Sequence, residues 1–342
     1  MADQIATRTA RWERFLSDDS AGHLFTVHYG PDQEARPLPW RDLLDERVEW
    51  AWRKYKRQMA RIEWLRDDML PFLDVYTGTE IFAEAFGCPV YYADDNMPFA
   101  LPLVTTAAEA DALRIPEVSH SSVTYLFDIA DELRRRAGPR ALVRLVDIQS
   151  PMDIAALIWE KSSFYPALIE APSAVQALAG KVKAFLVAFL DEWMGRYGPA
   201  YIAHYPEYYM PGGLTLSEDE VGAVSKRVYQ ELFHPELVEL SRCYGGIGVH
   251  CCAHARHQWD GFAEIPGLRL INLVQPEEVL REAYERFVRI PQMHSWCGDG
   301  EPWTWPEQYP DGARVVMRVP AGTRDEALRL SERMWEACGR IG

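Results

Sequence analysis

The stretch Gly245-Gly-Ile-Gly-Val-His-Cys-Cys-Ala-His254 is the most informative part of this 342-residue chain about its fold. Its apolar run, Gly246–Cys251, is typical of a buried strand, and it ends in imidazole and thiol groups. A helical pattern precedes it at Pro235–Tyr244, and another apolar run follows it at Leu268–Leu273. Strands that alternate with helices along a chain predict a parallel sheet with the helices outside.

The same alternation continues over most of the chain, and seven or eight such units favour a closed (β/α)8 TIM-type barrel of the α/β class. Residues 1–65, helical in pattern over 41–66, are expected to be an N-terminal helical extension packed on a barrel of residues 66–342, within one structural domain. The predicted strands are Phe72–Tyr76, Ala141–Ile148, Ala200–Tyr205, Gly246–Cys251, Leu268–Leu273, Phe287–Ile290 and Arg314–Val319. The predicted helices are Ile154–Trp159, Ala174–Tyr197, Glu218–Phe233, Pro235–Tyr244, Pro276–Arg286 and Arg324–Gly339.

The composition is that of a globular protein, with 48% hydrophobic and 25% charged residues. A net charge of −15 disfavours nucleic acid as a partner. Neither GxGxxG nor GxxxxGK[ST] follows a predicted strand, so neither NAD nor a nucleotide is expected. We expect no membrane association, because no run approaches about 18 apolar residues and the N-terminus lacks an apolar signal core. Six cysteines are too few for a disulfide scaffold, which favours the cytoplasm.

Polar and ionisable residues follow the predicted strands one after another. In a parallel barrel the chemistry lies at the C-terminal ends of the strands, so these residues predict an enzyme acting on a small molecule. The candidate catalytic residues are Asp74, His204, Glu207 and His250. The candidate substrate-binding residues are Tyr76, Asp147, Gln149, Tyr205, Asn272 and Trp296.

His250 and Cys252 are two residues apart in a strand, so their side chains face the same side, whereas Cys251 faces the other. Imidazole nitrogen and thiolate sulfur are ligands that Zn²⁺ accepts at about 2.0–2.3 Å. A catalytic zinc needs a third protein ligand, and Cys297, beside His294 in a loop, is the candidate. In the other interpretation, the cysteines are small buried residues and His250 is a hydrogen-bonded core residue.

The order of three segments resembles the uroporphyrinogen decarboxylase superfamily. Gly245 to Asn272 is similar to the region where a strand of this superfamily ends in His-x-Cys before a helix and a glycine-containing return. Phe72 to Leu103 resembles its early strand ending in Asp, with the helix and hairpin that follow, and Leu216 to Leu237 resembles the stretch between these regions. The resemblance implies a TIM-type barrel that is often a homodimer, in which Trp303 and Trp305 could lie at the interface or close a lid.

The superfamily implies two chemistries: cofactor-free decarboxylation of a tetrapyrrole, and zinc-dependent methyl transfer between a methylated corrinoid and a thiol. Only Asp74 matches a catalytic position of the decarboxylases, and their Arg-rich N-terminal signature is replaced by Ala21–His28. His250 and Cys252 match the methyltransferases' ligand pair, although Val316–Pro320 lacks their third cysteine. The resemblance therefore favours zinc-dependent methyl transfer, with a corrinoid protein as partner.

Two further hypotheses remain. In a metal-free decarboxylase or lyase, Asp74 would fix a small or tetrapyrrole-like substrate, and His250 or His204 would transfer a proton. In a non-catalytic protein, an aromatic-lined cleft would hold a corrinoid or porphyrin. The chain has no Asp-x-His-x-x-Gly corrinoid signature, so axial ligation of cobalamin by this chain is not expected. Metal content distinguishes the first hypothesis from these two.

Overall fold

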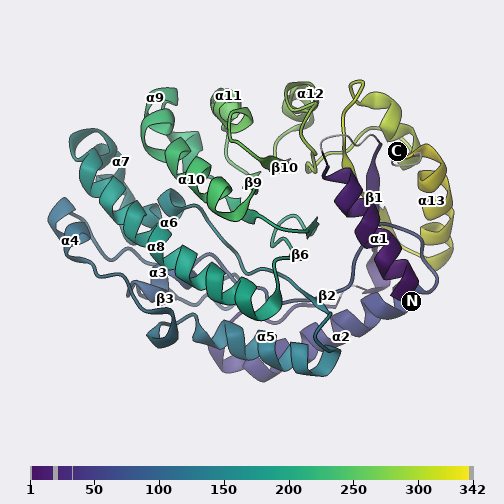
Figure 1. Ribbon diagram of the computed structural model, residues 1–342, viewed down its shortest axis with the longest axis horizontal. Helices are drawn as coiled ribbons and strands as arrows, with labels where there is room; N and C mark the ends of the chain where they lie inside the picture. The colour runs from purple at the N-terminus through teal and green to yellow at the C-terminus, as the bar shows by residue number, and fades with distance from the viewer. Residues whose placement is uncertain (1, 18–21, 33, 339–342) are drawn as a thin grey trace.

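The computed structural model describes residues 2–17, 22–32 and 34–338, which fold into a mixed α/β arrangement with helices around the strands (Figure 1). The strands are β1 (Leu24–Tyr29), β2 (Phe72–Leu73), β3 (Val90–Tyr91), β4 (Phe99–Ala100), β5 (Leu142–Val143), β6 (Tyr201–Ile202), β7 (Tyr209–Met210), β8 (Leu214–Ser217), β9 (Ile247–Cys251), β10 (Leu268–Leu273) and β11 (Val316–Ala321). The α-helices are α1 (Ala2–Phe15), α2 (Leu44–Ile62), α3 (Ile81–Ala85), α4 (Ala107–Ala112), α5 (Thr124–Ala137), α6 (Pro151–Ile158), α7 (Lys161–Glu170), α8 (Pro172–Tyr197), α9 (Lys226–Val228), α10 (His234–Tyr244), α11 (Trp259–Ala263), α12 (Glu277–Arg286) and α13 (Arg324–Ala337).

Parallel pairing joins neighbouring inner strands. β2 pairs with β5, β8 and β10 flank β9, and β11 pairs with β1, all in parallel. Single bridges connect these groups, including Arg144 with Ile202 and Gln292 with both Ile271 and Val315. Between β1 and the segment before β2, Asp68 N–H donates to the Phe25 carbonyl at 2.9 Å. The α/β class is therefore confirmed, whereas the pairing forms several short sheets rather than eight long strands.

The predicted strand Phe287–Ile290 is wrong, because α12 ends at Arg286 and its C-cap Phe287 leads into a turn. Pairing resumes at Gln292, whose N–H donates to the Arg314 carbonyl at 2.9 Å. The predicted helix Glu218–Phe233 is also interrupted. Its residues form a short 3-10 turn, α9 and a π-helical turn, with the Ser225 side chain capping α9.

The N-terminal segment differs from the expected helical extension, because it contributes a strand to the inner layer. β1 runs parallel to β11 in register, with Thr26 beside Arg318 and His28 beside Pro320. The sequence of β1, Leu-Phe-Thr-Val-His-Tyr, is rich in β-branched and aromatic residues, which favour strands. α2 follows and covers part of the inner strands, so residues 1–65 help to form the interior.

The long helix α8 belongs to the core. Its buried side includes Val182, Phe189 and Trp193, and the rings of Phe189 and Trp193 pack at a tilt against Phe127 of α5. By length and composition alone α8 could cross a membrane, which no segment was expected to do. Half of its most apolar window is buried inside the protein, as in core helices of globular proteins.

Candidate functional site

A group of three potential metal ligands lies where β9 ends. Asp219, His250 and Cys252 offer a carboxylate oxygen, an imidazole nitrogen and a thiol sulfur that lie within 4.8 Å of one another. A tetrahedral zinc with bonds of about 2.0–2.3 Å holds its ligand atoms about 3.5 Å apart, so side-chain shifts of about 1 Å would complete a site. In the described part of the chain, no other cluster of three such side chains meets this criterion. The donor set of nitrogen, sulfur and oxygen suits zinc.

A neighbouring strand orients His250. β9 and β10 place Asn272 beside His250, and Nδ1 of His250 lies 2.5 Å from Oδ1 of Asn272. The Asn272 amide nitrogen donates to the Met293 carbonyl, which turns the amide oxygen towards the imidazole. Nδ1–H therefore donates to Asn272 and leaves Nε2 as the available acceptor. Metal-binding histidines commonly use such a partner to fix their tautomer.

Backbone hydrogen bonds hold the loop that carries Asp219 against β9. The buried Asp153 carboxylate accepts the N–H groups of Asp219 at 2.7 Å and Glu220 at 3.0 Å. Oδ1 of Asp219 accepts the Cys252 N–H at 2.6 Å. Burial, together with the negative charge of Asp219, raises the pKa of the Cys252 thiol to about 12. A bound cation would favour the thiolate and reverse this shift.

The structure corrects the expectation that Cys297 is the third ligand. Cys297 is buried in a hydrophobic cluster with Tyr284 and Tyr309, and its thiol lies 3.9 Å from the His294 carbonyl oxygen. The neighbouring His294 also has both ring nitrogens engaged, by the Leu273 N–H and by Gln292. Asp219 is the third group beside His250 and Cys252, because the loop bearing it pairs with the end of β9.

A cavity of about 460 Å³ lies next to this group, inside the arrangement of strands. One wall is α2, which presents Trp50, Lys54, Arg57 and Arg61 at helical spacing. The inner faces of β1, β2 and β11 and the hairpin between β6 and β7 form the other walls. This volume is in the range of pockets for small molecules.

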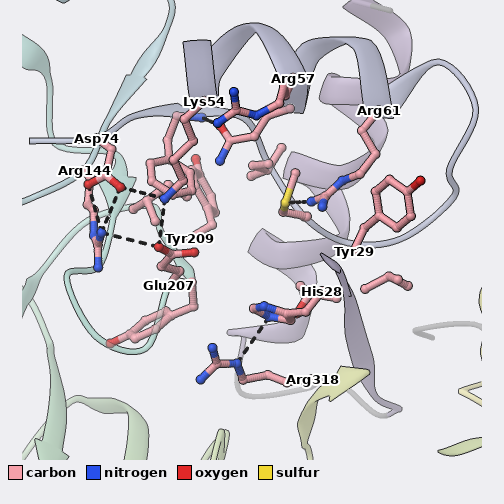
Figure 2. A pocket seen from close by; sticks show the side chains of 18 of the residues that line it. His28, Tyr29, Lys54, Arg57, Arg61, Asp74, Arg144, Glu207, Tyr209 and Arg318 are labelled. Atoms are coloured by element: carbon pink, nitrogen blue, oxygen red, sulfur yellow. Dashed lines mark hydrogen bonds and ion pairs between the residues drawn. The ribbon is translucent and has the colours of Figure 1, made fainter. Parts of the chain in front are cut away.

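One side of the cavity holds a compact charge network around Asp74 (Figure 2). The Asp74 carboxylate accepts from Lys54 Nζ at 2.6 Å and from Arg144 Nη1 at 2.8 Å, and Glu207 lies 3.2 Å from Lys54. Burial alone would raise the pKa of Asp74, but the charges of Arg144 and Lys54 outweigh it and hold that pKa well below its usual range. Asp74 is therefore an ionised, fully engaged carboxylate.

Tyr205 joins the cavity to the metal-ligand group. Its ring lines the cavity and lies edge-on to the His250 ring, with centroids 4.8 Å apart. The preceding residue, His204, has Nε2 3.5 Å from Asp147 Oδ2. Burial raises the pKa of Asp147 to about 7 and lowers that of His204 well below its usual value, so the imidazole is neutral at pH 7. The predicted catalytic residues therefore lie in one region, on either side of Tyr205.

Of the six predicted substrate-binding residues, Tyr205 lines the cavity and the other five do not. The Tyr76 hydroxyl donates to the Pro37 carbonyl at 2.7 Å, and its ring packs under Arg36 and Arg47. Trp296 lies under the guanidinium of Arg281. Gln149 pairs with Ser217, and its buried side-chain oxygen has no hydrogen-bond partner in the described residues. Trp303 packs against Arg333 of α13, and Trp305 lies against Gly298.

The sequence interpretation missed most of the cationic side chains of the cavity. Lys54, Arg57 and Arg61 were visible as a basic segment, and their i, i+3, i+7 spacing was the signal that they share one helix face. His28 and Arg318 lie on β1 and β11, and only the pairing of these strands brings them together.

Comparison with known proteins agrees with this architecture. No curated protein matches the sequence. A methyltransferase from Methanosarcina mazei is similar in structure, with a TM-score of 0.63 and 10% sequence identity over 97% of both chains, and this likeness concerns the fold. The family model described as uroporphyrinogen decarboxylase (URO-D) matches residues 72–286, more than half of the chain. The chain therefore belongs to the uroporphyrinogen decarboxylase family.

Proposed function

We propose that this protein is a zinc-dependent enzyme that transfers a methyl group from a methylated corrinoid, or a similar donor, to a thiol. The observation that carries the proposal is the gathering of Asp219, His250 and Cys252 within 4.8 Å at the end of β9. Membership of an enzyme family and a fold shared with a methyltransferase support it. Asp219 replaces Cys297 as the proposed third ligand.

The residues around the proposed zinc site have separate roles. When bound, zinc lowers the pKa of a thiol substrate and holds it as the nucleophilic thiolate. Asn272 orients His250 through the hydrogen bond to Nδ1. Tyr205 covers the His250 ring and borders the substrate cavity. His204 lies beside Tyr205, and burial holds its pKa well below the usual value, so it stays uncharged next to the site.

Zinc content tests this proposal directly. Untagged protein grown with zinc and measured by mass spectrometry should contain close to one zinc per chain. Asp219→Ala, His250→Ala and Cys252→Ser should each remove most of it, because each takes one of three ligands. Cys251→Ser and Cys297→Ser are matched controls and should keep zinc, since both thiols are buried away from the group. Metal-free wild type, or equal loss in Cys297→Ser, would overturn the proposal.

Activity provides the second arm of the test. Zinc-loaded protein with methylcobalamin and a small thiol should produce the methylated thiol, and Cys252→Ser should abolish this product.

A metal-free decarboxylase acting on a small acid is the second candidate function, favoured by the cationic side chains that line the cavity. It would take precedence if the wild type contained no metal and released carbon dioxide from a carboxylate substrate.

A further inference from the structure

We infer that the wall of the cavity formed by β1 and β11 binds the anionic group of a small organic acid, with Arg318 as the principal contact. The inference rests on the proposed function in one respect: it takes this acid to be the substrate of that enzyme. The binding itself follows from the charges and contacts of the cavity. It identifies a class of substrate: a compact molecule with a terminal oxyanion.

The cavity is positively charged, although the protein has a net charge of −15. Its lining contains more cationic side chains than carboxylates. The carboxylates are already engaged: Asp74 and Glu207 by Lys54 and Arg144, Asp68 by Arg11, and Glu34 by Arg53 and Arg57. A positive cavity whose own carboxylates are engaged attracts an anionic ligand.

Arg318 is a cation of the cavity that none of these carboxylates engages. Its Nε–H donates to Nε2 of His28 at 3.3 Å, and within the described chain its two terminal nitrogens have no hydrogen-bond partner and no carboxylate. The strand register explains its direction: Arg318 pairs with Thr26, and Thr26, His28 and Arg318 all line the cavity. Figure 2 shows Arg318 and His28 on the side of the cavity away from the Asp74 network. A guanidinium with free terminal N–H groups matches the geometry of an oxyanion.

His28 supports this arrangement as a neutral acceptor. Burial, and then the charge of Arg318, lower the pKa of His28 to about 4. Its imidazole therefore holds Arg318 by accepting the Nε–H and does not neutralise the guanidinium. Arg318 keeps its full charge for a ligand.

The remaining walls define the rest of the ligand. Trp12, Trp50 and Phe72 provide apolar surface, and Tyr205 leads to His250. A molecule bound through Arg318 would lay its hydrocarbon part against these rings and extend its other end towards Tyr205. The volume of about 460 Å³ limits it to a small molecule.

Ligand-observed NMR on the purified holoprotein tests the inference with three fragments: propionate, methylphosphonate and methanesulfonate. We expect at least one to bind in the millimolar range, and the tightest of them identifies the oxyanion. Arg318→Gln should weaken that binding about tenfold or more, since it removes a charge-assisted hydrogen-bond donor. Arg318→Lys should lose less affinity, because it keeps the charge but not the planar guanidinium.

Two controls and a fallback measurement make the result decisive. Arg329→Gln removes the same charge from an exposed position on α13 and should leave the affinity unchanged. Cys252→Ser should bind the fragment like the wild type, because Arg318 is not a metal ligand. If Arg318→Gln does not fold, the wild type still provides a measurement, since binding of the fragment should shift the NMR resonances of the His28 imidazole.

The inference is overturned if no fragment binds, if Arg329→Gln weakens binding as much as Arg318→Gln, or if Cys252→Ser abolishes binding. The last result would place the anion on the metal. Fragment binding that depends on Arg318 in a protein without zinc would instead support the anion site and contradict the proposed methyl transfer. The two proposals can therefore fail separately.

Discussion

His250 and Asn272 are paired across β9 and β10, with the imidazole Nδ1 2.5 Å from the amide oxygen. The Met293 carbonyl accepts from the other end of the amide, so this pair has one orientation. The strand that carries the proposed ligand and the strand that orients it are therefore hydrogen-bonded neighbours. The pairing of β9 with β10 therefore fixes the direction of the His250 ring.

Replacing Asn272 tests this positioning role. Asn272→Ala should weaken zinc binding about 10–100-fold, as the loss of a metal ligand's hydrogen-bond partner does, while the fold is retained. Asn272→Asp keeps an acceptor for Nδ1–H and should recover much of the affinity. Competition with a zinc chelator measures both variants. Unchanged affinity in Asn272→Ala would show that His250 needs no such partner.

Replacing one partner of the buried pair Asp74–Arg144 should strongly destabilise the folded protein. The Asp74 side chain is fully buried and that of Arg144 is 6% exposed, so Arg144→Met leaves a buried carboxylate with only Lys54 close by. We expect a loss of about 3–5 kcal/mol in the free energy of unfolding by urea. Arg196→Met, which breaks the exposed pair with Glu192, is the control and should cost about 1 kcal/mol or less. Similar losses in both variants would contradict the prediction.

The sequence predicted the elements around β9 well, because their pattern is local. Leu268–Leu273 was predicted with the observed bounds, and Gly246–Cys251 differs from β9 by one residue. Both runs are mostly apolar and each follows a turn glycine, so neither depends on distant contacts. The His250 and Cys252 pair followed from strand alternation alone.

The third ligand could not be predicted in the same way, because it depends on packing. Cys297 lies in a loop with glycine and polar neighbours in the sequence, yet Tyr284 and Tyr309 enclose it. Asp219 was placed inside a predicted helix, whereas the buried Asp153 carboxylate holds its backbone in a turn. Arg318 and His28 also meet only through the pairing of β1 with β11.

Stability should depend on pH through Glu80. Burial raises the pKa of Glu80 to about 8, and its buried Oε2 has no partner in the described chain, which fits a protonated acid. Between the unfolded pKa of 4.5 and about 8 the folded state binds more protons, so stability falls as the pH rises through this window. Asp147, with a pKa of about 7, acts in the same direction.

Glu80→Gln removes this contribution, since the amide does not ionise. The stability of the variant relative to wild type should increase between pH 5 and pH 8 by on the order of 4 kcal/mol, measured by urea unfolding at both values. The measurement at pH 5 is the internal control, because the wild-type side chain is still protonated in the folded protein there. A difference that does not change with pH would mean that Glu80 is ionised in the folded state.

Gly248 is required in β9 because Tyr208 occupies the space of a side chain. A Cβ at this position would overlap the Tyr208 hydroxyl and approach Cζ of the ring at 3.2 Å. Tyr208 is buried and lines the cavity, and Gly248 shares a strand face with His250, so the strain would reach the site. Gly248→Ala should therefore cost about 1–3 kcal/mol of stability and weaken zinc binding.

The double variant Gly248→Ala/Tyr208→Phe separates this overlap from an effect of the glycine backbone. Removing the hydroxyl leaves a contact of 3.2 Å to the ring, which a small shift can accommodate. We expect the double variant to recover most of the stability that Gly248→Ala loses, so that the two substitutions are not additive. Thermal unfolding of the wild type, both single variants and the double variant completes the cycle. Additive losses would show that β9 needs glycine for its backbone, and that Tyr208 does not determine the residue at position 248.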